Sequence, residues 1–383
     1  MVNRPREIII LSRDTKTKLL KTAFIFISLY IFLLSIKLLG HSFQLFGEGF
    51  AEAMLKTTAN PFTGLIMGIV ATSLIQSSST TTSIVVGMVA GGALSLNNAI
   101  PIIMGANIGT TITNTLVSFG HITRRAEFRR AFSAGVIHDF FNIAAVLVLF
   151  PLELKFGLIE KTALLLEEGF SGAGGLKMFN PLKILLDPVI NIIDVIFSNI
   201  PYNHFILMIL SLIMLFGALT FLVRNMRSLV LDKLELIINN YLFKNDVLGF
   251  VFGIIMTAIV QSSSVTTSLI IPLAGAGIIR LRQIFPYTVG ANIGTTVTAI
   301  LAALATQNHV AITVAFAHLV FNLFGIIVIY PFKFLLIKLA QFVGEKAALS
   351  KKNLVIFLGA YLSVYIIPLI FIIIFEIHIL SGH

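Results

Sequence analysis

The sequence predicts an all-α membrane protein of two inverted-topology repeats, each with a re-entrant helical hairpin, followed by an extra C-terminal span. Three observations lead to this prediction. Of the 383 residues, 57% are hydrophobic and only 11% are charged, against about 25% charged in soluble domains. Apolar stretches of about 20 residues, the length that crosses a bilayer, recur along the chain. Polar motifs inside these stretches occur twice and in the same order.

Several apolar stretches are long enough to cross a hydrocarbon core of roughly 30 Å. They are Leu19–Gly40, Ile100–Phe119, Phe128–Phe150, His204–Val223, Gln283–Ala305, Ala311–Leu336 and Leu354–Leu380. Two further stretches, Pro61–Leu96 and Val247–Ile279, have room for two legs but are broken by glycine, serine and threonine clusters. We expect these two stretches to form the re-entrant hairpins.

The internal repeat appears when the sequence is compared with itself at an offset of 185 residues. Gln76-Ser77-Ser78-Ser79 then falls on Gln261-Ser262-Ser263-Ser264, and the Gly-Ala-Asn-Ile-Gly-Thr-Thr segment from Gly105 falls on the identical segment from Gly290. At an offset of 180, His138, Phe141, Asn142 and Pro151 fall on His318, Phe321, Asn322 and Pro331. This shared order indicates an internal duplication.

Each repeat, counted as one span, one hairpin and two further spans, crosses the bilayer an odd number of times. The second copy therefore starts from the opposite side, which makes the repeats inverted and places equivalent motifs near the midplane, as in many secondary transporters. The expected organisation is a cytoplasmic N-terminal segment (1–18), repeat 1 (19–152), an external linker that carries an amphipathic helix (153–203), repeat 2 (204–338), and a cytoplasmic loop with the final span (339–383).

The distribution of charge predicts the orientation. Most of the 27 lysine and arginine residues fall in segments that are cytoplasmic if the N-terminus is cytoplasmic, which satisfies the positive-inside rule. They are not gathered with aromatic residues on one soluble face, so the net charge of +10 does not indicate nucleic acid. The chain has no cysteine, which excludes disulfides and thiolate metal sites. We expect a multi-pass membrane protein with a cytoplasmic N-terminus.

The repeated motifs place many hydroxyl and amide groups at membrane depth, where unpaired polar groups are costly. Hydroxyl and amide oxygens and the free carbonyls of a broken helix can ligate a hard cation, whereas hydroxyl hydrogens and helix N-terminal N–H groups can hold an anion. A single serine and threonine cluster could instead bond back to its own helix. The duplication of the cluster favours a binding site.

His138 and His318 each have an asparagine four residues later on the same helix face, so they can also pair simply within the bundle. The motifs contain no lysine or arginine. This matters if the substrate is an anion, because burying a bare dianion without positive charge is prohibitive. Sodium ions bound beside the anion would supply the charge, and the resulting linkage is what symport requires.

The sequence closely resembles the type II sodium-dependent phosphate cotransporters. The resemblance covers both repeats and rests on the paired Gln-Ser-Ser-Ser signatures, Pro101–Thr110, Glu127–Phe132, His138-Asp139 with Phe141-Asn142, Val260–Val265 and Thr298–Ala305. It implies inorganic phosphate as substrate, sodium as co-substrate, alternating access and no other cofactor. The chain is then not an enzyme, and its partners are phosphate, sodium and the lipid bilayer.

The resemblance also implies the site residues. The substrate would meet Gln76, Ser77, Ser78, Ser79, Gln261, Ser262, Ser263 and Ser264. Sodium would be held by oxygen atoms of Gln76, Ser79, Thr80, Asn107, Thr110, Thr111, Gln261, Ser264, Asn292, Thr295 and Thr296. Support would come from His138, Asn142, His318 and Asn322.

The sequence departs from the family in three ways. Ile122-Thr123-Arg124 stands where electrogenic members carry Ala-Gly-Asp, so we expect electroneutral transport. The large disulfide-bearing external loop and the last span of animal members are missing, so we expect an external C-terminus and a compact bacterial form.

Two alternative functions could use the same residues. A symporter of another small anion, a carboxylate or sulfate, could use the same paired hairpins. An intramembrane serine hydrolase needs one serine activated by one base, which the duplicated serine runs argue against.

Overall fold

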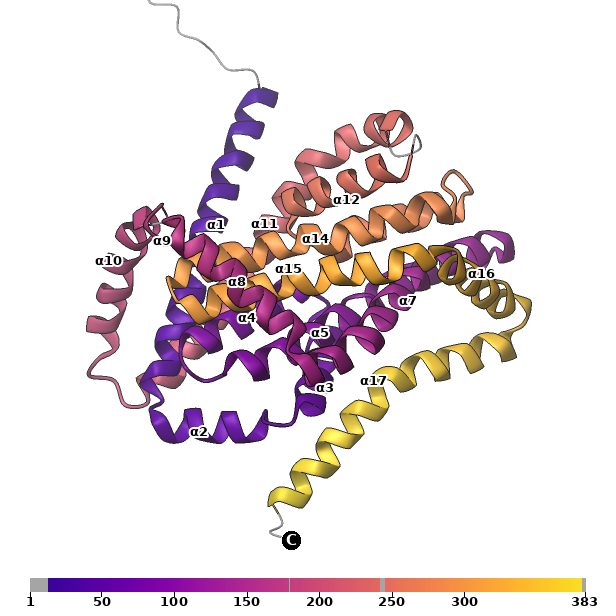
Figure 1. Ribbon diagram of the computed structural model, residues 1–383. Helices are drawn as coiled ribbons and strands as arrows, with labels where there is room; N and C mark the ends of the chain where they lie inside the picture. Colours follow the sequence, from indigo (N-terminus) through magenta and orange to yellow (C-terminus); the bar gives the residue numbers. More distant parts are fainter. Residues whose placement is uncertain (1–12, 179, 242–244, 381–383) are drawn as a thin grey trace, which may run out of the picture.

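The computed structural model describes residues 13–178, 180–241 and 245–380, whose regular secondary structure is entirely helical (Figure 1). The predicted cytoplasmic segment 1–18 therefore lies mostly outside the described residues. The helices of the first half are α1 (Arg13–Leu45), α2 (Glu48–Thr57), α3 (Pro61–Ile75), α4 (Ser78–Ala90), α5 (Leu96–Thr110), α6 (Ile112–Ser118) and α7 (Arg125–Phe156). A connecting region follows with α8 (Leu158–Gly172), α9 (Gly175–Met178) and α10 (Asn180–Phe197).

The second half holds α11 (Asn203–Tyr241), α12 (Asp246–Val260), α13 (Ser263–Gly275), α14 (Leu281–Thr306), α15 (His309–Ile329), α16 (Lys333–Leu349) and α17 (Lys351–Leu380). Residues 339–349, expected as part of a cytoplasmic loop, belong to α16, which packs on α7. The span expected over Ile100–Phe119 is divided at Thr111 into α5 and α6, whereas the matching α14 is continuous.

Within the described residues, six helical segments are long and apolar enough to cross a membrane. They are Leu19–Leu45, Leu96–His121, Arg125–Phe156, Asn203–Met226, Leu281–Thr306 and His309–Leu349. Each overlaps one of the first six predicted spans, so the prediction of a multi-pass all-α membrane protein is confirmed. The seventh predicted span, Leu354–Leu380, lies in α17, which leaves the body of the molecule in Figure 1.

The two stretches predicted as hairpins each form two short helices, α3 with α4 and α12 with α13. Legs of 15 and 13 residues are roughly 20–23 Å long, shorter than the roughly 30 Å core, as a re-entrant hairpin requires. Asn60 starts the first leg as an N-cap, accepting a hydrogen bond from the Phe62 amide at 2.9 Å, and Pro61 suits the first helical position. Before it, α2 meets α3 at a bend of 93°.

Each hairpin packs its first leg against a neighbouring helix, α3 on α5 and α12 on α14, through glycines at equivalent places. A methyl group at Gly105 would lie 2.9 Å from the Ile69 amide nitrogen, and one at Gly290 would lie 3.2 Å from that of Ile254. Because only glycine permits so close a backbone approach, the repeated glycines hold the polar segments of α5 and α14 beside the hairpins.

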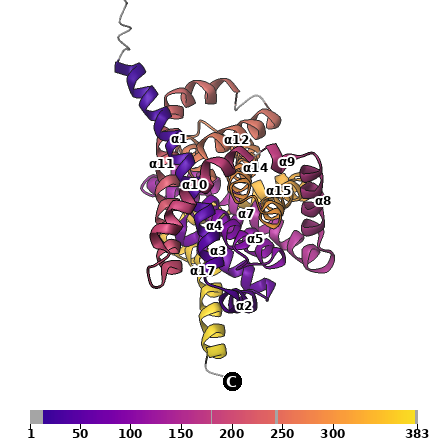
Figure 2. The same cartoon turned by 90° about the vertical axis from the view of Figure 1, so that its left-hand side faces the viewer.

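The first long helices of the two halves, α1 and α11, also pack on each other and lie side by side in Figure 2. Around them, buried aliphatic side chains of α1, α4, α5, α11, α14 and α15 form one core cluster, and a second cluster joins α5, α7, α13, α14, α15 and α16. On the outside of α1, Lys37 pairs with Asp187 of α10 and His41 Nε2 lies 3.1 Å from Asp194.

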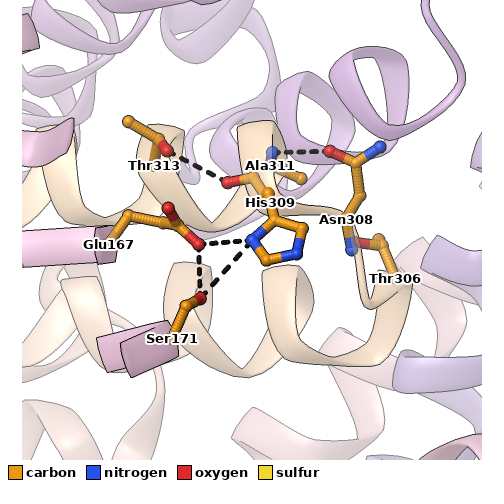
Figure 3. A network of polar contacts seen from close by, with 7 residues as sticks. All are labelled: Glu167, Ser171, Thr306, Asn308, His309, Ala311 and Thr313. Carbon is orange, nitrogen blue, oxygen red and sulfur yellow. Dashed lines mark hydrogen bonds and ion pairs between the residues drawn. The ribbon is translucent and has the colours of Figure 1, made fainter. Parts of the chain in front are cut away.

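The connecting region is tied to the start of α15 by a polar network (Figure 3). His309 Nδ1 lies 2.6 Å from Glu167 Oε1, which also accepts a hydrogen bond from the Ser171 hydroxyl at 2.6 Å. Asn308 caps α15 by accepting from the Ala311 amide at 3.0 Å. Burial alone would raise the pKa of Glu167, but the hydrogen bonds from Ser171 and His309 outweigh it and hold that pKa below its ordinary value of 4.5.

Candidate functional site

The two Gln-Ser-Ser-Ser motifs lie where each hairpin breaks. Gln76 ends α3 with φ 58° and ψ 26°, and Gln261 ends α12 with φ 61° and ψ 21°. This left-handed conformation is uncommon for residues other than glycine, and the two glutamines adopt it at equivalent places of the two repeats. The backbone N–H of each glutamine donates to the carbonyl of the threonine four residues earlier at 2.7 Å, which closes the helix before the turn.

The serine after each glutamine starts the second leg. Ser77 and Ser262 are extended, and their hydroxyl oxygens accept hydrogen bonds from the amides three residues later at 3.2 and 3.3 Å. These are N-caps. A hydroxyl pair then links the legs of each hairpin, Thr72 with Thr81 at 2.9 Å in the first and the equivalent threonines, Thr257 with Thr266, at 2.7 Å in the second.

The two breaks meet each other directly. The Ser79 hydroxyl donates to the carbonyl of Gln261 at 3.1 Å, and the Ser264 hydroxyl donates to the carbonyl of Gln76 at 3.3 Å. The contacts are reciprocal, because each hairpin uses the equivalent serine to reach the equivalent glutamine carbonyl of the other hairpin. The predicted substrate residues of the two repeats are therefore brought to one place.

A cavity of about 340 Å³ opens at this meeting point. Its polar lining comes from both breaks and from α11: Ser77, Ser79, Thr80, Gln261, Ser262, Thr220 and Arg224. Arg224 is the important addition, because none of the repeated motifs contains a cation. Its position one turn beyond Thr220, at the end of an apolar span, was the signal available in the sequence.

Of the residues predicted to hold sodium, Gln76, Ser79, Thr80, Gln261 and Ser264 lie at the breaks and Thr111 directly follows α5. The others, Asn107, Thr110, Asn292, Thr295 and Thr296, are buried on α5 and α14. Their hydroxyl hydrogens point into their own helices: Thr110 donates to the Ala106 carbonyl at 2.9 Å and Thr295 to that of Ala291 at 3.0 Å. Thr296 does the same toward the Ile293 carbonyl at 2.7 Å, whereas the one hydroxyl hydrogen of Thr111 has two acceptors within reach, the Ile108 carbonyl at 2.8 Å and the Asp139 carboxylate. A hydroxyl that has given its hydrogen to a carbonyl presents only lone pairs, which suits a cation.

The predicted supporting residues of the first repeat form a buried network with the second repeat. His138 Nε2 lies 2.7 Å from Asn292 Oδ1, and the Asn292 amide donates to Asn142 Oδ1 at 2.7 Å. Asn142 in turn donates to the Asn107 carbonyl at 2.7 Å. The network therefore joins α5, α7 and α14 below the breaks.

The equivalent network of the second repeat is not formed. Among the described residues, both ring nitrogens of His318 and Oδ1 of Asn322 are buried without a hydrogen-bond partner. Asn107, the counterpart of Asn292, donates to the Ile103 carbonyl of its own helix at 3.0 Å. Elsewhere the inequality runs the other way: within the part of the chain that the structure describes, the remaining buried polar side-chain atoms without a partner belong to Thr82, Ser83 and Thr113 of repeat 1, whose counterparts Thr267, Ser268 and Thr298 are all hydrogen-bonded.

Asp139 has no counterpart in the second repeat and takes a structural position. It accepts hydrogen bonds from Thr111 at the α5–α6 break, from Thr115 at 3.3 Å and from the Tyr361 hydroxyl of α17 at 3.2 Å. The asymmetric aspartate thus joins the divided helix of repeat 1 to the final helix.

The family model described as Na+/Pi-cotransporter matches residues 31–158 and 213–343, and each matched segment contains one of the two breaks. The chain is similar to sodium-dependent phosphate transport protein 2A of Rattus norvegicus, with 35% identity over 87% of this chain and 64% of the relative. It is 32% identical to protein 2B of Homo sapiens over 93% of this chain and 66% of the relative. The chain thus spans slightly less than two thirds of these relatives. No solved structure matches it.

Proposed function

Because the chain belongs to the Na+/Pi-cotransporter family, a family of transporters rather than enzymes, we propose that it is a secondary active symporter that carries inorganic phosphate with sodium. The observation that carries the proposal is the reciprocal contact between Ser79 and the Gln261 carbonyl and between Ser264 and the Gln76 carbonyl. It joins the two polar breaks at one cavity, where a single substrate can touch both repeats.

Phosphate is held at the breaks by hydrogen-bond donors and positive charge. The first amides of α4 and α13, at Ser78, Ser79, Ser263 and Ser264, have no acceptor within their helices, and helix N-termini attract anions. Arg224 on the wall of the same cavity offers a guanidinium that suits a phosphate oxygen pair. The glutamines hold the left-handed turns that aim these groups.

Sodium is held beside the breaks by oxygen atoms. The buried hydroxyls of Thr110 and Thr295 present lone pairs, and the side chains of Asn107 and Asn292 and the carbonyls at the breaks add further oxygens, the ligands a hard cation prefers. Cations there and the anion at the breaks stabilise each other, which makes the binding of each depend on the other.

Transport proceeds by alternating access, and the unequal networks of the two repeats support this. Repeat-related residues have the same chemistry, yet His138 is hydrogen-bonded and His318 is not. Leaving buried polar atoms unpaired costs about 1–3 kcal/mol each. In a second conformation, the His138 network opens and Asn107 pairs with His318 and Asn322. The hydrogen bonds lost around His138 are then replaced by equivalent bonds around His318, so the two conformations have comparable free energies.

The orientation and charge balance are part of the same proposal. The N-terminus is cytoplasmic, the protein resides in a bacterial inner membrane, and the repeats are inverted. In both views the N-terminal end of α1 and the C-terminal end of α17 lie at opposite ends of the molecule, which supports an external C-terminus. Ile122-Thr123-Arg124, in place of Ala-Gly-Asp, supports electroneutral transport.

The test is uptake of labelled phosphate into proteoliposomes under an inward sodium gradient, compared with potassium or choline. Accumulation is expected only with sodium and is abolished by Gln76→Ala or Gln261→Ala. Competition by unlabelled sulfate and carboxylates separates phosphate from other anions. If the protein is folded and inserted but shows no sodium-dependent phosphate uptake, the proposed symport is wrong. A current evoked by phosphate would contradict electroneutral transport.

A further inference from the structure

A second cavity, of about 450 Å³, lies at the end of the molecule where α7 and α14 begin. In Figure 1 these ends gather near α16, on the right. Its lining includes four arginines, Arg129 and Arg130 of α7, Arg280 just before α14 and Arg282 in its first turn, together with Gln341 and Glu345 of α16. The cavity is separate from the one at the hairpin breaks, which shares none of these residues.

The four guanidinium groups are not neutralised by the protein. In the part of the chain that the structure describes, none of them forms an ion pair with an aspartate or glutamate. Glu345 is the single carboxylate on the cavity wall. The positive-inside rule accounts for arginines at a membrane surface, but it does not require four of them to converge on one hollow, where like charges repel each other.

Two of these arginines are held in place by uncharged contacts. The Arg130 Nε donates to the carbonyl of Gly275 at 2.8 Å, which caps the last turn of α13. A Cβ at Gly277 would lie 3.4 Å from the same Nε, so the guanidinium lies against this turn, where Gly277 has φ +80°. The Arg282 guanidinium stacks over the Phe334 ring at 5.5 Å. Both groups are oriented while keeping their full charge.

The wall between α7 and α16 is also tightly built. A methyl group at Gly344 would lie 2.7 Å from the Arg129 carbonyl, so α16 packs directly on the turn of α7 that carries Arg129. A neighbouring cavity of about 600 Å³ shares Arg129 and Glu345 and adds Arg125 and Lys346. The positive charge is therefore continuous along this end of the molecule.

We infer that the cavity lined by Arg129, Arg130, Arg280 and Arg282 is a binding site for a phosphate group, separate from the hairpin breaks and independent of sodium. Guanidinium groups bind phosphate through paired, charge-assisted hydrogen bonds, and a phosphate here relieves the repulsion among four unpaired cations. The ligand is a free phosphate or the headgroup of an anionic lipid. Because α7, α14 and α16 all line the cavity, the bound group fastens these helices together.

The test measures equilibrium binding of labelled inorganic phosphate to the full-length protein in phosphatidylcholine nanodiscs, in potassium buffer without sodium. Arg129→Gln with Arg280→Gln is expected to weaken saturable binding by roughly tenfold or more, the factor that loss of charged hydrogen bonds brings. Glu345→Gln is expected to strengthen it. Thermal unfolding confirms that each variant is folded.

The matched control is Arg124→Gln with Lys338→Gln, which removes two charges that line neither cavity and leaves binding unchanged. The measurement is made without sodium, on which binding at the hairpin breaks depends in the proposed function, so this result is independent of whether the protein transports phosphate. Loss of the binding in Arg224→Gln, which alters the cavity at the hairpin breaks, would place the phosphate there and overturn the inference. Equal weakening in the control variant would overturn the inference, because it would show only general charge attraction.

A second arm uses nanodiscs that contain phosphatidic acid, with native mass spectrometry to count retained lipid. Lipid retained by the wild type but not by the Arg129→Gln, Arg280→Gln variant identifies the headgroup as the source of the phosphate group. Phosphate binding in phosphatidylcholine alone identifies the free anion. If neither the binding of free phosphate nor the retention of phosphatidic acid depends on these arginines, the inference of a phosphate-binding site is wrong.

Discussion

Arg224 shares a cavity with Ser77 and Gln261 and gives the proposed anion site its positive charge. We expect Arg224→Gln to lower kcat/KM for phosphate uptake roughly 10- to 100-fold, since a hydrogen bond to a charged group contributes about 1.5–3 kcal/mol. Arg224→Lys should keep part of the activity because the charge remains. Uptake measured over a range of phosphate concentrations decides this, and an unaltered kcat/KM in Arg224→Gln would remove the arginine from the site.

The two buried histidines offer a comparison within one chain. His138→Leu strips Asn292 Oδ1 of its partner at 2.7 Å and should lower the free energy of unfolding by about 1–3 kcal/mol. His318→Leu removes a ring whose nitrogens are unpartnered here, so it should leave stability unchanged or raise it. Thermal unfolding in detergent measures both.

His318→Leu should nevertheless reduce phosphate uptake, because the second conformation needs that ring as a partner for Asn107. If both leucine variants lost the same stability, or if His318→Leu transported normally, the proposed exchange of networks between the repeats would be wrong.

At the scale of elements, glycines set the distance between each hairpin and its long helix. Gly105→Ala and Gly290→Ala force a methyl group into the backbone of α3 and α12 and should each destabilise the protein by about 1–3 kcal/mol. Gly217→Ala is the matched control, since a Cβ at this position on α11 meets nothing within 4 Å. Thermal unfolding should separate the control from the other two variants, and three equal melting temperatures would refute the close packing.

The contact between α8 and α15 should make stability depend on acid. The folded pKa of Glu167 lies below 4.5, so its ionised form is favoured by folding. Its contribution is fully present above pH 4.5 and is lost as the pH falls through the folded pKa. Glu167→Gln should therefore lower the melting temperature at neutral pH and approach the wild type at an acid pH below the folded pKa of Glu167. A melting-temperature difference that is the same at both pH values would exclude this role for the carboxylate.

At the scale of the whole molecule, the two halves are related in sequence but differ in their contacts. Gln76 is exposed, whereas Gln261 is 7% exposed and its side-chain oxygen accepts from Thr298 at 2.7 Å. Because the chain has no cysteine, a single cysteine at either position can be labelled cleanly. In the absence of substrate, a thiol reagent should modify Gln76→Cys faster than Gln261→Cys.

Sodium and phosphate together should reduce that difference in labelling rate, since binding shifts the population toward the second conformation. Sodium alone with sulfate serves as the control. Equal labelling rates at the two positions, or labelling rates that do not change when sodium and phosphate are added, would contradict alternating access between the two halves.

From the sequence one can predict the helical membrane fold, the breaks within two apolar stretches and the duplicated motifs, because span length, glycine clusters and repetition are properties of the order of residues along the chain. The sequence also predicted that His138 and Asn142 support the polar segments. The three-dimensional packing was needed to show that Ser79 and Ser264 each reach the glutamine carbonyl of the other repeat, that Arg224 of α11 lines the same cavity, and that arginines at the starts of α7 and α14 line another. These contacts join residues that lie far apart in the chain. His138 and His318 occupy equivalent positions but differ in their partners, because packing and conformation, not residue type, decide which hydrogen bonds form.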